Sequence, residues 1–222
     1  MSKILKVNFV DIATRVIMGL DVAKRNGSML DVDYVGVKAP QFSFARLDGA
    51  DPALGVEMVS TGEVGCLGHD FEEAFLKALL SVGYNLSVRS VLLSTGPVEG
   101  KAAFLDSAKM LSGLGVKIYA TRGTADFLRT NGIDATMLHW PLEQASPNVL
   151  EFLKPGKLDL VINIPKNYQW QELTNDYVIR RKAVDFGIPL ITNIQLAERF
   201  VQALALKTID RLEVKAYSEY IR

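Results

Sequence analysis

Short apolar runs alternate with amphipathic segments from residue 88 onward. The apolar runs predict strands over residues 91–93, 117–120, 135–138, 158–164 and 189–192. Apolar residues spaced three and four apart predict helices over 102–114, 125–130, 175–186 and 194–206. Strands and helices that alternate in this way build right-handed βαβ units. The pattern therefore predicts an α/β fold, a Rossmann-like parallel sheet flanked by helices, with ligands at the carboxyl ends of the strands.

The first 83 residues follow a less regular pattern. The elements they predict are helices over 10–18 and 71–82 and short strands over 33–37, 56–59 and 64–67. Asp70 is the expected N-cap of the second helix, and proline and glycine make residues 39–55 mostly irregular. So small a segment with so little strand makes a poor core alone. Residues 1–83 are therefore expected to be a small α+β piece of a larger domain, with exposed apolar surface.

The chain divides into three parts, residues 1–83, the alternating segment 88–206 and a tail over 207–222. The linker Gly83–Ser87 has too few Pro, Gly and Ser residues for a long flexible tether. The tail is charged and weakly patterned, so it either docks on the rest of the chain or stays loose.

Composition narrows the function classes. The 222 residues carry 25 basic and 25 acidic side chains without a basic block, so no electrostatic footprint for nucleic acid is present. No apolar run is long enough to span a membrane. The single Cys66 cannot form an internal disulfide, which fits a reducing compartment, and we expect a cytoplasmic protein.

Neither zinc nor paired-carboxylate chemistry is favoured. Because Cys66, His69 and His139 are the only residues of their kinds, a zinc site is not expected, and Cys66 reads as a small buried hydrophobe. Glu57 and Glu63 lie around a tight turn without His or Lys beside them, which favours interface salt bridges over acid–base catalysis.

The most informative stretch runs from Ser90 to Lys101, with a second one at residues 120–124. In each, a short apolar run leads through glycine and hydroxyl residues into a helical segment. A chain that turns directly from a buried strand into a helix presents unpaired backbone N–H groups, which attract an anion together with the helix dipole. Thr121 and Thr124 supply hydroxyl donors and Lys101 a cation, so a phosphate or carboxylate site is one interpretation. Glycine placed there purely for turn geometry is the other.

Plainer interpretations stand beside the functional ones for several residues. Lys101 is either a ligand-binding cation or a solvated residue in the first turn of a helix, where a cation opposes the dipole. Asn163, at a strand end, is either a ligand-binding amide or turn chemistry, and Trp140 is either a stacking wall or a packed surface anchor. Arg180 and Arg181 are helix neighbours that face different directions, so we interpret at least one as a structural ion-pair partner.

Several longer motifs now point to one family. Lys38-Ala-Pro-Gln-Phe-Ser-Phe44, Asp51-Pro52 and residues 57–64 (EMVSTGEV) closely resemble the end of the second ATP-grasp unit in the carbamoyl-phosphate synthetase large chain. The C-terminal motifs are TRGT at 121–124, VIN at 161–163, VIRR at 178–181 and IPLITN at 188–193. They look like the family's C-terminal allosteric domain, which has the methylglyoxal-synthase-like fold. The resemblance covers nearly the whole chain.

The resemblance implies a parent enzyme that makes carbamoyl phosphate from bicarbonate, ammonia or glutamine, and two ATP with Mg²⁺ or Mn²⁺, for pyrimidine and arginine synthesis. In the family, the nucleotide-binding body and the metal-binding carboxylates precede the point that corresponds to residue 1. The chain is therefore expected to hold no cofactor of its own and not to make carbamoyl phosphate alone.

The resemblance also implies an effector site. In bacterial relatives, the phosphate of UMP or IMP is held at positions that match Lys101, Thr121, Thr124 and Asn163, with the position of Ser94 nearby. Trp140 replaces a further phosphate-binding lysine, as in the animal ammonia-using type activated by N-acetylglutamate and in the animal pyrimidine-pathway type. Thr192 matches a hydroxyl of the bacterial ornithine site, whose glutamate is replaced here by Ala39, so that site is incomplete.

Two functions from different classes follow. The first is a regulatory module that binds a small anionic effector of the nucleotide or N-acetylglutamate type and signals to the ATP-grasp domains through residues 1–83, with 38–44 and the helix 71–82 as mechanical links. The second is a methylglyoxal-synthase-type lyase, which needs a carboxylate base near the phosphate. We rank it lower because residues 140–143 and 164–167, where the synthases carry aspartates, have none.

A structural role in oligomerisation is the third reading. The expected partners are the effector, the rest of the large chain, a glutaminase small subunit of the parent and further copies of the chain, with no nucleic acid and no membrane.

Overall fold

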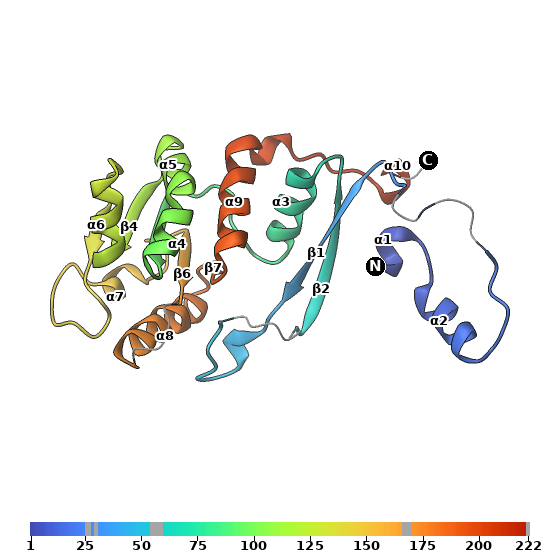
Figure 1. Ribbon diagram of the computed structural model, residues 1–222, viewed down its shortest axis with the longest axis horizontal. Coiled ribbons are helices and arrows are strands. Elements are labelled where there is room, and N and C mark those ends of the chain that lie inside the picture. The colour runs from blue at the N-terminus through green and yellow to red at the C-terminus, as the bar shows by residue number, and fades with distance from the viewer. Residues whose placement is uncertain (25–27, 29–30, 54–59, 166–169, 221–222) are drawn as a thin grey trace.

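The computed structural model describes residues 1–24, 28, 31–53, 60–165 and 170–220. Its larger part is a five-stranded, fully parallel sheet with the strand order β5-β4-β3-β6-β7 (Figure 1). The strands are β3 (Ser90–Thr95), β4 (Lys117–Thr121), β5 (Thr136–Leu138), β6 (Leu160–Ile164) and β7 (Leu190–Ile191). The predicted α/β fold is confirmed, and each of these strands lies within a few residues of its predicted place.

Helices cover both faces of the sheet, because its central strands are apolar on both sides. Val91 and Leu93 of β3 belong to one hydrophobic core, and Leu92 between them belongs to a second, as the alternation of side chains along a strand requires. The first core is covered by α5 (Leu105–Gly113), α6 (Arg122–Thr130) and α9 (Ile194–Leu206), and the second by α7 (Val149–Phe152) and α8 (Trp170–Asp185).

Around the parallel sheet, the largest differences from the predicted helices lie in residues 98–113 and 149–152. The helix expected over 102–114 is in fact two, α4 (Val98–Ala103) and α5, which meet at the buried Phe104. Helix α4 begins early because Pro97 at its start has φ −69°, which suits the first turn of a helix. Helix α7 was not expected, because a single turn is too short to show a period. A capping box between Asn148 and Glu151 stabilises it.

The N-terminal part contributes a second sheet of two strands. β1 (Val35–Gln41) pairs antiparallel with β2 (Gly62–Gly68). The strand expected over 33–37 is thus longer and enters the region 39–55 that was expected to be irregular, because its pairing with β2 continues through Pro40. The strand expected over 56–59 lies outside the described residues.

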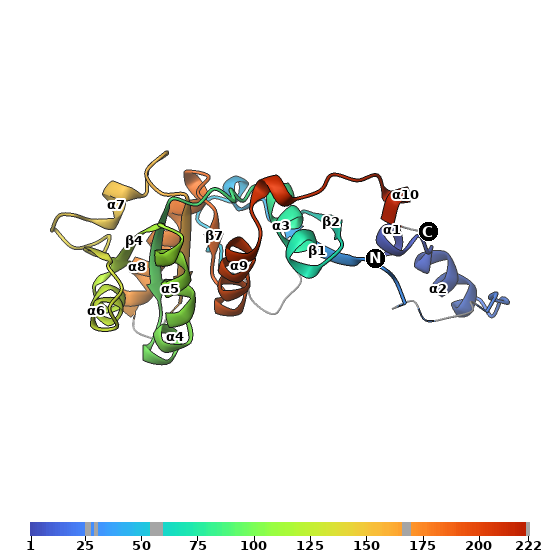
Figure 2. The same ribbon diagram turned by 90° about the horizontal axis from the view of Figure 1, so that it is seen from above.

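Helix α3 (Phe71–Ser81) connects the two sheets. Asp70 is its N-cap, as predicted, and accepts a hydrogen bond from the backbone N–H of Glu73 at 2.9 Å. One side of α3 packs on β1 and β2 and another on α9, so the helix lies between them in both views (Figures 1 and 2). Phe75 and Leu79 thereby join the first core of the parallel sheet.

Two short helices, α1 (Ser2–Leu5) and α2 (Phe9–Ile17), lie at the far end of an elongated molecule (Figures 1 and 2). The side chain of Ile4 packs on the bare backbone of Gly36 and Gly65, where an added Cβ would come within 2.8 and 2.7 Å of it. Those glycines therefore make room for α1 on the two-stranded sheet.

The apolar side of α2 is exposed. The helix has no buried residue, and the exposed fractions of Val10, Val16 and Ile17 are 72%, 64% and 82%. Asn8 caps it, with its side chain accepting from the N–H of Asp11 at 3.1 Å. The expectation of exposed apolar surface in the N-terminal part is confirmed.

The tail docks on the N-terminal part. Its helix α10 (Tyr217–Tyr220) lies beside α1 (Figure 2), and the hydroxyl of Tyr217 donates to the carbonyl of Ile4 at 2.7 Å. The ammonium of Lys77 in α3 donates to the hydroxyl of Tyr220 at 2.9 Å. Of the two alternatives for the tail, docking is the one observed.

We expect Phe200→Ala to lower the free energy of unfolding by about 3–5 kcal/mol, because it opens a cavity between α9 and α3. The ring is fully buried and packs edge-on against Tyr84, with 5.8 Å between centroids. Urea unfolding followed by circular dichroism measures the loss. Leu206→Ala in the same helix is the control, because that side chain is 63% exposed and the expected change is under about 0.5 kcal/mol. Equal losses in both variants would contradict this packing.

Candidate anion-binding site

Three neighbouring strands bring their polar ends together. β3 lies between β4 and β6, so Ser94, Thr121 and Asn163 meet at the carboxyl edge of the sheet, with Ser94 directly opposite Asn163 in register. The hydroxyl of Thr121 donates to that of Ser94 at 3.4 Å. All three side chains are buried, at most 2% exposed, so they form a small polar island in an apolar sheet.

The two strand-to-helix turns face one another across this edge. The backbone N–H of Thr95 donates to the hydroxyl of Thr124, in the first turn of α6, at 3.3 Å. The ammonium nitrogen of Lys101 lies 3.5 Å from the place where a Cβ on Gly123 would stand. Lys101 therefore reaches over the first turn of α6, and the two stretches that the sequence singled out form one site.

A glycine allows this approach of α4 to β3. A Cβ on Gly100 would come within 2.7 Å of the carbonyl oxygen of Thr95, a contact that backbone atoms do not tolerate. Lys101 is the fourth residue of α4 rather than a first-turn residue, since the helix begins at Val98.

The structure adds Asp176 to the site, a residue that the sequence reasoning missed. Its side chain is 1% exposed and accepts hydrogen bonds from the amide of Asn163 at 2.8 Å and from the hydroxyl of Ser94 at 3.4 Å. A signal was available: Asp176 and Arg180 stand four apart on α8, on the same stripe as the buried Ile179 and Ala183. Charges on the buried stripe of a helix indicate a polar site.

Arg180 connects the site to the N-terminal part. Its guanidinium is 2% exposed, donates to the Asn163 side-chain oxygen at 2.9 Å, and binds both oxygens of Asp51 at 2.7 and 2.5 Å. Burial acts to raise the pKa of Asp51, but the hydrogen bonds and charge of Arg180 outweigh it, so this pKa lies below 3.8, its ordinary value.

Arg181 holds the same N-terminal segment from another side of α8. It donates to the carbonyls of Phe44, Leu47 and Ala50 at 3.1 Å and pairs with Asp185 at 2.7 Å. Both arginines are therefore ion-paired, which confirms and extends the prediction that at least one of them would be.

Trp140 lies just beyond β5 and is partly buried against the second core, the cluster to which Leu92 and Tyr119 belong. This packing agrees with the anchor interpretation and leaves the stacking role a prediction. Glu63 does form a salt bridge, with Lys38 at 2.9 Å, but within the β1–β2 ribbon, so the expected interface pairing stays a prediction; Glu57 lies outside the described residues.

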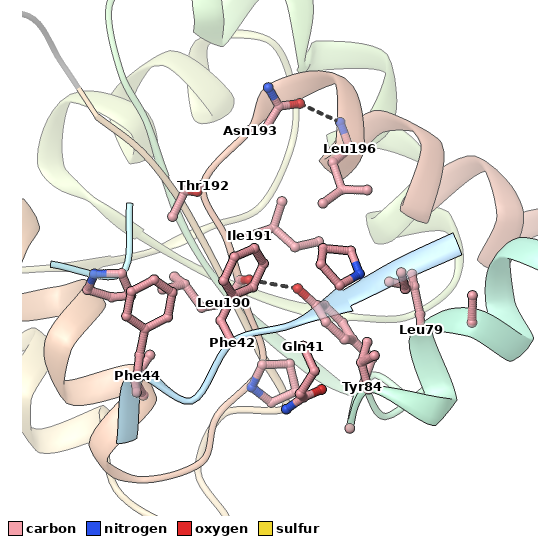
Figure 3. A pocket seen from close by; sticks show the side chains of 18 of the residues that line it. Gln41, Phe42, Phe44, Leu79, Tyr84, Leu190, Ile191, Thr192, Asn193 and Leu196 are labelled. Carbon is pink, nitrogen blue, oxygen red and sulfur yellow. Dashed lines mark hydrogen bonds between the residues drawn. The ribbon is translucent and has the colours of Figure 1, made fainter. Parts of the chain in front are cut away.

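Thr192 does not join the Ser94 cluster. It lines a separate, largely apolar pocket of about 450 Å³ between β1, α3 and β7, together with Ala39, the position that the resemblance links to ornithine (Figure 3). At one wall the hydroxyl of Tyr84 donates to the carbonyl of Leu190 at 2.7 Å, and burial raises the pKa of Tyr84 to about 12. Among the described lining residues Lys38 carries the one charge, so no carboxylate is present there to bind an amine.

Metal and membrane features were searched over the described residues. No group of three or more His, Cys, Asp and Glu side chains lies close enough to hold a metal ion. Within the same residues, no helix has the length and apolar character needed to cross a membrane.

Residues 103–192, which include β4, β5, β6 and β7, match the family of MGS-like domains, and the five-stranded parallel sheet with its flanking helices is consistent with such a domain. The chain is also similar, over 92% of its length and with 44% identity, to the "Multifunctional protein pyr1-3" of Dictyostelium discoideum. It is 39% identical over 99% of its length to the "Multifunctional protein URA2" of Saccharomyces cerevisiae, and equally so to the mitochondrial carbamoyl-phosphate synthase (ammonia) of Homo sapiens.

The chain spans only 9%, 10% and 15% of the length of these three relatives. The resemblance to the C-terminal part of carbamoyl-phosphate synthetase is thereby confirmed over almost the whole chain.

We expect Asp51→Asn to destabilise the fold by about 1–2 kcal/mol at neutral pH, because it leaves the buried guanidinium of Arg180 without its charge partner. The loss is smaller than for a fully buried pair, since Asp51 is 41% exposed. A carboxyl whose folded pKa is depressed stabilises the fold above its unfolded pKa, and this contribution disappears as pH falls through the folded value. The difference from wild type in urea unfolding should therefore shrink as pH falls below about 4.

Asp106→Asn is the matched control, because that carboxylate is 84% exposed in a surface pair with Lys109 and its removal should change stability by under about 0.5 kcal/mol. A destabilisation by Asp51→Asn that is the same at pH 7 and in acid would show that the ion pair is not its cause.

Proposed function

We propose that this chain is the regulatory, effector-binding C-terminal region of a carbamoyl-phosphate synthetase large chain. The observation that carries the proposal is the buried polar island of Ser94, Thr121 and Asn163 beside the first turn of α6, over which Lys101 reaches. Hydroxyl and amide donors, a helix N-terminus and one cation are what a small anion needs. The effector proposed is of the nucleotide or N-acetylglutamate type.

The signal would travel through α8. Asn163 in the site is hydrogen-bonded to Arg180, which binds Asp51 in the N-terminal part. An effector that changes the position of Asn163 changes the partners of a buried charge, so the site and the N-terminal segment have a physical link. Regulation requires that the effector bind one of two states of this link more tightly.

The rest of the large chain is the proposed partner of the N-terminal part. The exposed apolar side of α2 is the kind of surface that another protein segment covers. In the proposed parent, the preceding ATP-grasp body binds ATP and Mg²⁺ or Mn²⁺, and the further proposed partners are a glutaminase subunit and other copies of the chain. The parent's carbamoyl phosphate would serve pyrimidine and arginine synthesis, and we propose a cytoplasmic location.

The second candidate, a lyase acting on dihydroxyacetone phosphate, regains some support from Asp176, a carboxylate next to the proposed anion site. As a base it would have to reach the substrate, whereas its hydrogen-bonded oxygen is already shared by Ser94 and Asn163. Clear formation of methylglyoxal by the purified chain would reverse our ranking.

Thermal unfolding against a panel of ligands tests the proposal. The panel is UMP, UTP, IMP, N-acetylglutamate, ornithine and inorganic phosphate. A ligand that binds only the folded state raises the melting temperature, by about 5–10 °C at a hundred times its Kd for a chain of this size. We expect a shift with one of the nucleotides or with N-acetylglutamate, and its loss in Lys101→Ala.

The matched control is Lys109→Ala, which removes a half-exposed lysine from α5 and should leave the shift unchanged. Thr121→Val, which deletes one buried hydroxyl at constant shape, should also reduce the shift, whereas Thr130→Val at the exposed end of α6 should not. The absence of any shift, or one that survives Lys101→Ala, would speak for a structural role instead.

A further inference from the structure

The anion site contains an anion of its own. Asp176 of α8 is 1% exposed and accepts hydrogen bonds from Asn163 and Ser94, two of the donors assigned above to the effector. Thr121 is hydrogen-bonded to the same Ser94 hydroxyl. The donors of the site are thus already oriented around a carboxylate.

A second negative charge that enters such a site meets two costs. It must share donors that Asp176 engages, and it is repelled by the carboxylate in surroundings from which water is largely excluded, where charge interactions are strong. The repulsion is about twice as large for a dianion as for a monoanion, because it scales with the charge.

Arg180, the positive charge on α8 itself, is paired with Asp51, and the positive features around the first turn of α6 lie on other elements. Lys101 of α4 lies over Gly123, and the N-terminus of α6 adds its partial positive charge. A ligand that complements both sides has its negative end at α4 and α6 and a hydrogen-bond donor toward α8. The hydrogen bond between Ser94 and Asp176, at 3.4 Å, is long, so it is the one that such a donor most readily replaces.

We propose that Asp176 sets the charge selectivity of this site. It favours a ligand whose group beside Lys101 and the start of α6 carries a single negative charge, as one carboxylate does, and which has an N–H or O–H donor for the Asp176 carboxylate. It disfavours a phosphate or sulfate dianion, so of the two effector types proposed above it favours the carboxylate over the nucleotide. This inference rests on the proposed function, because it concerns the ligand class of the same site.

A purely structural role for Asp176 predicts a different effect of replacing this residue. If the carboxylate only holds Asn163 in place for Arg180, its replacement changes stability and leaves ligand preference as it was. Asp176→Asn separates the two roles, because the amide oxygen can still accept from Ser94 and Asn163 while the negative charge is lost.

The test is calorimetric titration of the full chain with sodium sulfate and with inorganic phosphate above neutral pH, at constant ionic strength. We expect Asp176→Asn to bind both at least about tenfold more tightly than wild type, the change of a relieved charge repulsion. The gain should disappear when Lys101→Ala is added. Asp126→Asn, which removes an exposed carboxylate from the neighbouring helix α6, is the control for overall charge and should give no gain.

Sulfate and phosphate affinities that are the same in Asp176→Asn and wild type, or a gain that Asp126→Asn shares, would overturn the proposal. If Asp176→Asn does not fold, Asp176→Ser keeps a hydroxyl acceptor, and the same gain is expected of it.

The test also separates this inference from the proposed function. An organic effector that binds wild type while Asp176→Asn gains no sulfate affinity would leave the function standing and refute the selectivity. If Asp176→Asn binds sulfate more tightly than wild type does, but no organic effector binds wild type, the charge selectivity would stand and the proposed function would be refuted.

Discussion

A guanidinium that has left water keeps its charge, and this constraint organises the centre of the molecule. Arg180 cannot lose its proton inside a protein, so it is stable there only where acceptors surround it. Its acceptors come from two distant places, the end of β6 through Asn163 and the N-terminal segment through Asp51. The position of α8 on the sheet, the end of β6 and the path of the chain near Asp51 are therefore fixed together.

Helix α8 also contacts two other parts of the molecule. Asp176, one turn before Arg180, points to the polar ends of β3 and β6, while Arg181 holds carbonyls of the segment between Phe44 and Ala50. A small rotation of α8 would change contacts at both places at once. This arrangement differs from the links that the sequence suggested, the segment 38–44 and helix α3, because it depends on side chains rather than on chain continuity.

The sequence predicts the parallel sheet well. Buried strands are recognised by their apolar runs, and the helices between them by the helical spacing of their apolar residues. It predicts the meeting of Ser94, Thr121 and Asn163, since strand ends share one edge. It cannot predict Asp176 as readily, because its contact with Ser94 depends on how α8 is rotated. The resemblance places Thr192 apart from that cluster, at the ornithine position with Ala39, and both residues line the pocket beside the edge strand β7. Pieces of a single turn such as α7 leave no period to find.

The contact between Tyr217 and Ile4 joins residues 213 positions apart in the chain. During synthesis on a ribosome, α1 emerges before the parallel sheet and α10 emerges after it, so this surface of the N-terminal part is complete only once the sheet has been made. The parallel sheet, by contrast, closes among residues that emerge together. The two halves should therefore mature in the opposite order to their synthesis, with the MGS-like domain as the template on which the earlier segment settles.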